Sequence, residues 1–579
     1  MLFAGPMASA ASLPDRDDVL RGQELQRQQA QRELTTAPAP VMRAAAGSAR
    51  VPYPIEPPPC FAIDALAMDD DMPRPLRREL HSERAPLRGR CLGGAGLAAL
   101  ATNLNARVHA LGWLTSQIEL PPQNLSAGRL IVAWRPGRLT AVRELPGPVG
   151  LASLPLRPGD ALTVAALDQA ADAYNRLPSL RTQLLVVPSP GETGHGVEVQ
   201  VQAGSPWRAS LSLDNSSPRE FGVAQLSAQI ALDRPSSLLG GVPLLDQLTL
   251  DLGINPQRHS PQRSNLSAGL NYTVALGFQL LHVFARSGQS ARRVQGTSID
   301  FMQHGDDTAA GARWTWTWHR DAQSKWNLWL GAEQRRAHRA IEDVELVLQR
   351  RHTLSAELGG NLWLRSRIAE RSLDWVIDIS ASRTQRRASL DAFEPEVTPK
   401  MRERRMSMAT AVPFKLTHAA PVTAPTTTSP ATLDLRLSLH SVANPLAPSD
   451  LPLIGTRYAV RGFDGDAPLQ GKQAAVLRTD VRWPSRAIGQ GVLDIAPYLG
   501  LDVGMVRGLA AASPGGRSRS GATLGLQARS RAPLTAALTA GATHAGALIA
   551  DFALSTPLHG GAAAKHRPWV PSVSLSVQL

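Results

Sequence analysis

Apolar and polar residues alternate at every second position through the C-terminal part of the chain. From Trp207 onward, each run has one apolar face and one polar, often charged face, as in residues 207–214, 247–254, 314–318, 493–503 and 572–579. Because successive side chains of a β-strand point to opposite faces, this period predicts strands. A soluble β-sandwich would also alternate, but a single sheet this long must close on itself to hide its edges. At about 22 residues per strand and turn, residues 206–579 predict a transmembrane antiparallel β-barrel of about 16 strands.

The preceding part of the chain shows the period of helices. Apolar residues recur at helical spacing at Leu97, Leu100, Leu104, Val108 and Leu111, and again at Leu162, Leu167, Ala170, Tyr174 and Leu177. Strand-like runs flank both stretches. We therefore predict two consecutive small α/β domains, over 53–137 and 138–205. His195, which lies between two glycines, is expected in a loop.

Three segments precede these domains. Residues 1–12 are small and apolar, and Ala8-Ser9-Ala10 looks like a cleavage site, so a remnant of a secretory signal peptide is expected; an untidy cytosolic N-terminus fits equally well. Residues 13–34 predict a polar helix with glutamines on all sides. Such a helix has no apolar face to pack on a core and belongs in water or in a water-filled cavity, unless the segment is a disordered tail. Residues 35–52 are rich in proline and alanine and predict an extended linker.

Composition and charge narrow the class of protein. The chain has 579 residues, of which 43% are apolar, and these values are typical of a globular chain. Arginine supplies nearly all of the positive side of the net charge of +13. The arginines form no stripe with interleaved aromatics, so we predict no nucleic-acid partner; an arginine-lined, water-filled pore explains them as well. No apolar run of about 18 residues follows the N-terminus, and no transmembrane helix is expected.

The chain has two cysteines, Cys60 and Cys91. In an exported protein they would form a disulfide that staples the first small domain. The alternative is a pair of buried free thiols. Their spacing is not that of metal ligands.

Several short motifs agree on one family. They are Pro59-Cys60-Phe61-Ala62-Ile63, Gly112-Trp113-Leu114-Thr115-Ser116, Asn175-Arg176-Leu177-Pro178-Ser179, and Asp214-Asn215 followed by Gly222. On these residues the chain resembles the outer-membrane transporters of two-partner secretion, the filamentous-hemagglutinin and hemolysin exporter family. The resemblance implies two polypeptide-transport-associated (POTRA) domains in the periplasm and a barrel in the bacterial outer membrane. It also implies that the helix at 13–34 plugs the resting pore.

The most specific match is Val460-Arg461-Gly462-Phe463. In the family this tetrapeptide is the tip of a long loop folded back into the barrel, here expected over 442–471. Its arginine pairs with an aspartate in a strand motif that Gly500-Leu501-Asp502-Val503-Gly504 matches. The resemblance thus implies that Arg461 pairs with Asp502, between Gly500 and Gly504. The alternation independently places Asp502 on the polar, lumenal face, where a bidentate arginine–carboxylate bond would anchor the loop.

Motifs for enzyme chemistry are missing from the sequence. Gly516-Arg517-Ser518-Arg519-Ser520 lacks the last glycine of a nucleophile elbow, Gly471-Lys472 lacks a phosphate loop, and no His-Glu-x-x-His is present. We therefore predict no catalytic residue, no metal site and no cofactor.

The function that the resemblance implies is secretion of one unfolded partner exoprotein, of the adhesin or hemolysin type, from the periplasm to the cell surface through the barrel. The other expected partners are outer-membrane lipid and the barrel-assembly machinery that inserts the protein. Two alternatives stay open. The first is a barrel-assembly or insertion factor, in which the polar helix would have no role. The second is a solute porin, which would not need residues 60–202.

Overall fold

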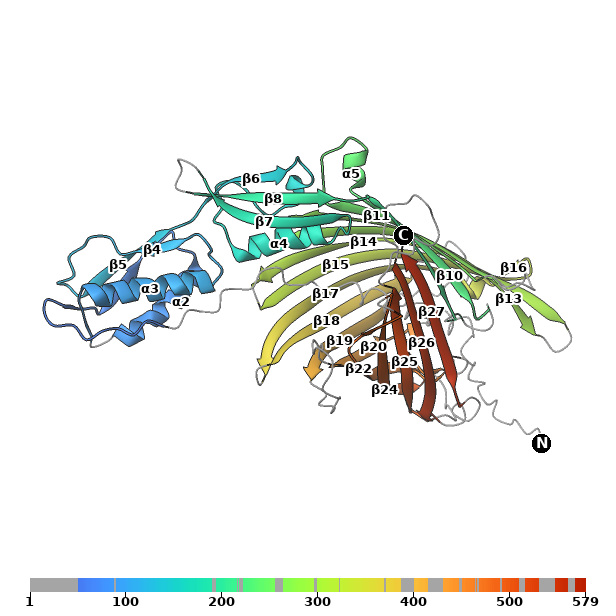
Figure 1. The fold of residues 1–579 in the computed structure, drawn as a ribbon. Helices are drawn as coiled ribbons and strands as arrows, with labels where there is room; N and C mark the ends of the chain where they lie inside the picture. Colours follow the sequence, from blue (N-terminus) through green and yellow to red (C-terminus); the bar gives the residue numbers. More distant parts are fainter. Residues whose placement is uncertain are drawn as a thin grey trace, which may run out of the picture.

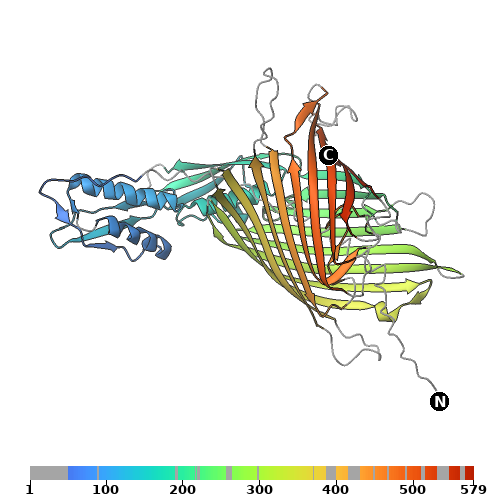
Figure 2. The same ribbon diagram turned by 90° about the horizontal axis from the view of Figure 1, so that it is seen from below.

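The structure is a computed structural model that consists of two small α/β domains followed by one large barrel. It describes residues 50–87, 90–189, 194–215, 217, 222–255, 264–295, 299–321, 323–368, 371–386, 400–414, 431–446, 450–463, 465, 468–489, 492–509, 516–530, 547–560 and 568–578. The second domain lies against one end of the barrel, and the first projects away from it (Figures 1 and 2). The expected signal remnant (1–12), the expected plug helix (13–34) and most of the expected linker (35–52) lie outside the described residues.

The first domain packs two helices against small sheets. Its elements are β1 (Phe61–Ala62), β2 (Ala65–Met68), α2 (Arg74–Leu80), η1 (His81–Leu87), β3 (Cys91–Leu92), α3 (Gly94–Ala110), β4 (Gln117–Glu119) and β5 (Arg129–Arg135). The strands β2, β5 and β4 form one sheet, in that order, and β1 pairs with β3. The apolar stripe of α3 enters the core, where Leu100, Leu104 and Val108 are fully buried. Leu111 is 44% exposed because the helix ends one residue earlier.

The second domain has one long helix on a three-stranded sheet. Its elements are β6 (Leu139–Leu145), η2 (Leu151–Ser153), α4 (Val164–Asn175), β7 (Leu180–Pro188) and β8 (His195–Ala203), and the sheet order is β6-β8-β7. Thr163 caps α4 by accepting a hydrogen bond from the N–H of Ala166. The loop predicted at His195 is wrong, because β8 begins at this residue. Its N–H donates to the carbonyl of Arg138, and this tertiary pairing overrides the local signal of the flanking glycines.

Sixteen long strands among the described residues form the barrel wall, each antiparallel to its neighbours. They are β9 (Trp207–Asp214), β10 (Gln225–Asp233), β11 (Asp246–Ile254), β12 (Ser264–Leu276), β13 (Gln279–Gln295), β14 (Asp300–Arg320), β15 (Ser324–Ile341), β17 (Arg351–Ile368), β18 (Arg371–Arg386), β19 (Lys400–Phe414), β20 (Ala431–Ala443), β22 (Leu469–Arg482), β24 (Leu493–Leu509), β25 (Ser518–Ser530), β26 (Ala547–His559) and β27 (Val570–Gln578). The connections carry α5 (Pro235–Leu238), η3 (Val347–Gln349) and the short strands β16 (Val344–Glu345), β21 (Leu453–Ile454) and β23 (Arg486–Ile488). The last strand pairs with the first, so the sheet closes and the predicted barrel is confirmed.

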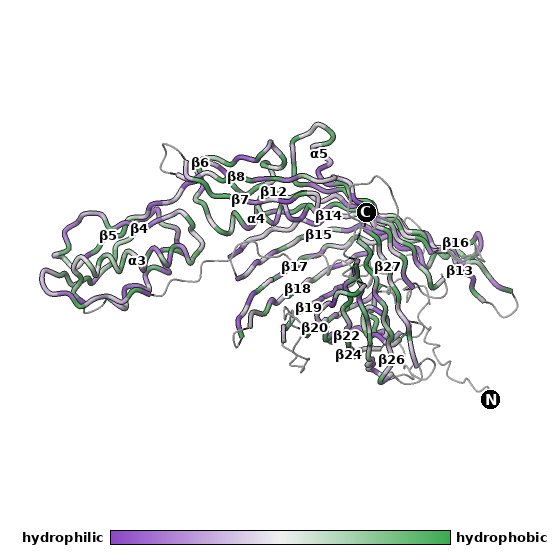
Figure 3. Tube along the Cα trace, viewed as in Figure 1, coloured by the Kyte–Doolittle hydropathy of each residue, from purple (hydrophilic) through white to green (hydrophobic). Residues whose placement is uncertain are grey.

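The period of two sorts side chains between the outer face and the lumen. On β24, Leu499, Leu501 and Val503 are 47%, 56% and 51% exposed, whereas Asp502 is 1% exposed. Figure 3 shows the same alternation of hydropathy along the other strands. Outward tryptophans lie near the strand ends closest to the α/β domains, at Trp207, Trp316, Trp318, Trp326 and Trp375. Aromatic side chains of this kind mark one membrane interface of a barrel.

The lumen carries charges of both signs. Arg313 donates to Glu357 at 2.6 Å, and Arg339 donates to Asp307 at 2.8 Å. The arginines that the sequence placed in a pore are therefore interleaved with carboxylates. Among the described residues, no helix is both long and apolar enough to cross a membrane.

Charged side chains join the second domain to the turns at one end of the barrel. Asp172 on α4 forms ion pairs with Arg320 at the end of β14 and with Lys325 on β15, the latter at 2.8 Å. Burial alone would raise the pKa of Asp172, but the hydrogen bond from Arg320 and the charge of Lys325 outweigh it and hold this pKa below its usual range. The N–H of Ser179 also donates to Asp233 on β10 at 3.0 Å. These bonds orient the second domain on the barrel.

Candidate functional site

The loop between β20 and β22 turns back into the barrel. It is expected over 442–471, and in the structure β20 ends at Ala443 and β22 begins at Leu469. The short strand β21 within this loop pairs with the first residues of β22. The tip is buried: Val460 is 0% and Phe463 is 5% exposed. The chain therefore presents its most specific motif to the inside of the barrel.

Arg461 binds the carboxylate of Asp502 on β24 in bidentate geometry. Its Nε donates to Oδ2 at 2.7 Å, its Nη2 donates to Oδ1 at 2.6 Å, and its backbone N–H donates to Oδ2 at 2.9 Å. Nη2 also donates to Oδ1 of Asp480 on β22, at 2.7 Å. Arg461 is 8% exposed and Asp502 is 1% exposed. Removing one partner would leave a buried charge uncompensated, which costs far more than losing an exposed pair.

A second arginine completes this cluster. Arg478 lies directly opposite Asp502 in the pairing of β22 with β24, and its Nε is 3.8 Å from Oδ1 of Asp502. Its Nη1 donates to the backbone carbonyl of Tyr458 in the loop at 3.1 Å. Arg461 and Arg478 thus face the carboxylates of Asp480 and Asp502 in a buried cluster, and Nη2 of Arg482 lies 3.9 Å from Asp480 as well.

Apolar contacts hold the residues on either side of Arg461. Val460 and Phe463 form a small core with Ile454, Leu469 and Val506. The guanidinium carbon of Arg519 on β25 lies 4.5 Å from the centre of the Phe463 ring, in cation–π geometry. The tip is therefore fixed by packing as well as by charge.

Glycines give the tip room to approach the wall. Gly462 has a φ of +96°, and a Cβ there would also lie 2.5 Å from the carbonyl oxygen of Thr556. A Cβ at Gly504 would lie 2.6 Å from Cγ2 of Val460, and one at Gly500 would collide with the guanidinium of Arg461. The glycines of both motifs are needed for close approach.

Sequence reasoning missed several residues of this site. Asp480 and Arg478 complete the charge cluster, and a Cβ at Gly521 would collide with the carbonyl oxygen of Arg461. Charged residues at every second position, at 478, 480 and 482, could have predicted that these side chains face the lumen. Their contact with the loop depends on strand register, which no local pattern reveals.

The loop also reaches the seam where the first and last strands meet. Nη1 of Arg457 donates to Oδ1 of Asn215, which directly follows β9, at 3.1 Å. Asn215 in turn accepts from the N–H of Val573 at 2.9 Å and donates to the carbonyl of Pro571 at 3.0 Å. The inward loop is therefore tied both to the wall at β24 and to the closure of the barrel.

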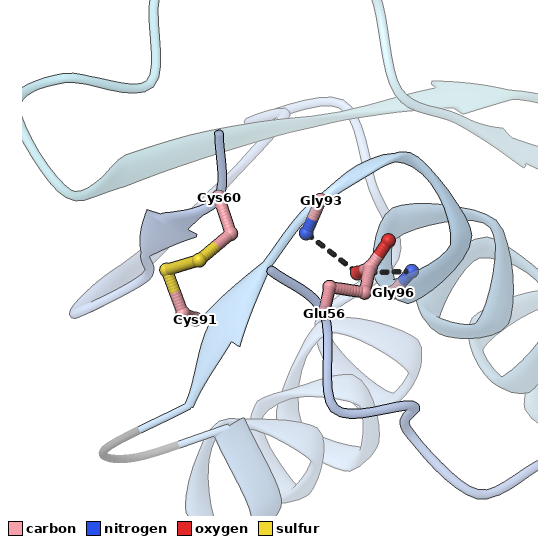
Figure 4. Close-up of a disulfide and its surroundings, with 5 residues drawn as sticks. All are labelled: Glu56, Cys60, Cys91, Gly93 and Gly96. Carbon is pink, nitrogen blue, oxygen red and sulfur yellow. Dashed lines mark hydrogen bonds between the residues drawn. A yellow bond between two sulfur atoms is a disulfide. The ribbon is translucent and has the colours of Figure 1, made fainter. Parts of the chain in front are cut away.

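A disulfide joins Cys60 to Cys91 in the first domain, beside the start of α3 (Figure 4). Next to it, the carboxylate of Glu56 accepts from the N–H groups of Gly93, Ala95 and Gly96 at 2.6, 2.9 and 2.8 Å. Partial desolvation would raise the pKa of Glu56, but these three bonds hold it below its usual range. The disulfide and the carboxylate together fix the chain that enters the domain to the N-terminus of α3.

No group of three or more His, Cys, Asp or Glu side chains within the described ranges is arranged to hold a metal ion. The charged cluster at the loop tip pairs cations with anions and leaves no set of carboxylates facing a common point. Its chemistry is that of an anchor.

Known proteins share the family and the fold of this chain. The family model described as haemolysin secretion/activation protein ShlB/FhaC/HecB matches residues 194–528, and the model of the ShlB-type POTRA domain matches residues 69–137. The outer membrane transporter CdiB-2 of Burkholderia pseudomallei is 25% identical over 546 residues, which cover 87% of this chain and 86% of that protein. The hemolysin transporter protein HpmB of Proteus mirabilis is 25% identical over 284 residues, 48% of each chain.

Solved structures show the same fold. CdiB from Acinetobacter baumannii superposes with a TM-score of 0.77 at 20% identity, covering 99% of this chain and 100% of that one. CdiB from Escherichia coli does so with a TM-score of 0.76 at 19% identity and the same coverage.

Proposed function

We propose that this chain exports one unfolded partner protein through its barrel, in which the inward loop is anchored to the wall. The chain belongs to the haemolysin secretion/activation family ShlB/FhaC/HecB. The resemblance to two-partner secretion transporters is thereby confirmed. The protein is an outer-membrane transporter with its POTRA region in the periplasm.

The observation that carries the proposal is the bidentate pair of Arg461 with Asp502 inside the barrel. A loop in a wide lumen would sample many positions and would obstruct the passage of another chain. The pair, with Asp480 beside it, holds the tip against β22 and β24 and leaves the opposite side of the lumen to the client. Export then requires a rearrangement of the loop that starts from this defined position.

We propose that the α/β domains receive the client in extended form. In the sheet of the second domain, β7 and β6 are the outer strands, because β8 lies between them. Each outer strand has an edge to which an extended peptide can add by main-chain hydrogen bonds. The ion pairs of Asp172 keep these edges at the mouth of the barrel. The expected plug at 13–34 would leave the pore when the client arrives.

Transport by this route is not enzymatic in our proposal. Folding of the client outside the cell prevents its return and supplies the driving force. The partner is a secreted exoprotein of the adhesin or hemolysin type. Lipid of the outer membrane surrounds the barrel, and the barrel-assembly machinery inserts it.

The direct test compares Arg461→Ala and Asp502→Ala with a matched variant, Arg313→Ala, which loses an arginine–carboxylate pair on a different part of the wall. The first two variants should abolish secretion of the client, and Arg313→Ala should retain it. Heat-dependent gel mobility shows that each barrel has folded and inserted. Normal secretion by both loop variants would refute the anchoring role.

Deletion of the gene in the native host separates the remaining alternatives. Loss of one large exported protein, with other barrels intact, supports a dedicated transporter and identifies the client. A general loss of outer-membrane barrels would instead indicate an assembly factor. An unchanged surface and medium would indicate a solute pore.

A further inference from the structure

A row of polar residues crosses the outer face of five adjacent strands. Ala381, Arg404, Ser441, Gln473 and Arg507 lie directly opposite one another on β18, β19, β20, β22 and β24. Two residues closer to the periplasm, the same strands carry an apolar row. Its members are Ile379, Met406, Leu439, Ala475 and Met505.

Both rows face away from the lumen. They alternate with lumenal residues such as Arg478 and Asp502, and Ile379, Leu439 and Met505 are 55%, 40% and 49% exposed. The two rows line a groove of about 450 Å³, which we call the outer groove. The small side chains of Ala475 and Ser441, on its middle strands, leave room between larger neighbours.

The outer groove is basic along its upper rim. Arg404 and Arg507 have no carboxylate within ion-pair distance among the residues that the structure describes, although Arg313 and Arg339 in the lumen are paired. Two residues further toward the cell surface than the polar row, Arg383 on β18 lies opposite Arg402 on β19. The rim therefore carries several cations that the described part of the protein does not neutralise.

The arginines just above the rim lie at a membrane interface. On β18, Trp375 marks the interface near the periplasm, and Arg383 follows eight residues later. Eight residues span about 27 Å along a strand and about 21 Å across the membrane at a tilt of roughly 40°, close to the apolar band of about 25 Å in such barrels. Arg383 and Arg402 thus lie at the level of the headgroups of the outer leaflet, and Arg404, opposite Ala381, lies two residues closer to the periplasm, from where its long side chain can extend to them.

We propose that the outer groove binds a phosphorylated glycolipid of the outer leaflet. Its acyl chain would lie over Met406, Leu439 and Met505, and its phosphates would bind Arg404 and Arg507. Guanidinium groups bind phosphate oxygens strongly and in bidentate geometry. The two arginines are three strand spacings apart, about 14 Å, which suits a headgroup with two separated phosphates better than the single phosphate of a phospholipid.

The test measures lipid retained by the purified full-length protein in mild detergent, by native mass spectrometry, after incubation with a bisphosphorylated glycolipid. The wild type should retain this lipid, and the double variant Arg404→Glu/Arg507→Glu should retain on the order of tenfold less. The matched control is Arg336→Glu on β15, an outward arginine away from the groove, which should retain as much as the wild type.

Three outcomes would overturn the proposal. They are equal retention by the double variant, equal retention of the glycolipid after its phosphates are removed, and full displacement by phosphatidylglycerol at the same phosphate concentration. If the charge reversals prevent folding, as judged by heat-dependent gel mobility, Arg404→Gln/Arg507→Gln makes the same test with a milder change. Lipid retention is measured without a client, so the result is independent of secretion.

Discussion

Replacement of Asp502 by alanine should release the loop tip from the barrel wall without unfolding the barrel. Removing one member of a buried ion pair costs about 3–5 kcal/mol. Arg461 would keep its bond to Asp480 at 2.7 Å, so the lower end of this range, about 3 kcal/mol, is expected. This free energy corresponds to an increase of about 150-fold in the fraction of undocked loop. Asp480→Ala leaves the bidentate pair intact and should cost about 1.5 kcal/mol, roughly a tenfold increase.

Hydrogen–deuterium exchange of the loop measures this opening directly. The N–H of Arg461 donates to Asp502, so in Asp502→Ala it would exchange faster simply because its hydrogen-bond acceptor is gone. The N–H of Ala459 is the better reporter, because it donates to the carbonyl of Thr456 within the loop, at 3.2 Å. Glu357→Ala, which breaks the Arg313 pair elsewhere on the wall, serves as the control and should leave the loop unchanged. An unchanged rate at Ala459 in Asp502→Ala would refute the view that the pair holds the loop.

Three further predictions concern the glycines, the domain contact and the disulfide. Gly504→Ala would place a Cβ 2.6 Å from Cγ2 of Val460, so it should cost about 1–3 kcal/mol and lower the temperature at which the barrel loses its folded gel mobility. In the control Gly288→Ala, the new Cβ would lie 3.7 Å from the carbonyl oxygen of Leu266, and this temperature should not change. Because the pKa of Asp172 is lowered in the folded protein, its contribution is present above the ordinary value of about 3.9 and is lost as the pH falls through the lowered value. Fluorescence energy transfer between the second domain and the barrel should therefore stay constant from about pH 7 to 5 and fall only below about pH 4; a loss near pH 6, or the same acid transition in Asp172→Asn, would contradict this. Reduction of the disulfide between Cys60 and Cys91, separated by 31 residues, should destabilise the first domain by about 3–4 kcal/mol in thermal unfolding, and a variant with serine at both positions should not respond to reductant.

The period of two and the local motifs account for much of the architecture. Alternation predicts the lumenal face of Asp502, because it separates the two faces of a strand, and its persistence from Trp207 to the last residues predicts the barrel. The pairing of Arg461 with Asp502 came from resemblance, since the two residues are 41 positions apart and lie on different elements. Asp480 and Gly521 were missed because their place at the tip depends on which strands are neighbours and in what register. These are long-range properties that a local period does not contain.

Arginine shows most clearly why register decides function here. Arg461 and Arg478 meet carboxylates in the lumen, Arg320 at the end of a strand meets Asp172 of another domain, and Arg404 on the outer face has no carboxylate partner among the described residues. A shift of one residue exchanges the two faces of a strand, so the same side chain would move from a lumenal cluster that contains carboxylates to the lipid interface. The net charge of +13 therefore has no single cause. Each arginine must be assigned from its face and its level in the membrane, and Arg404 and Arg507 differ from the paired lumenal arginines because they can bind an anion that the described part of the protein does not itself provide.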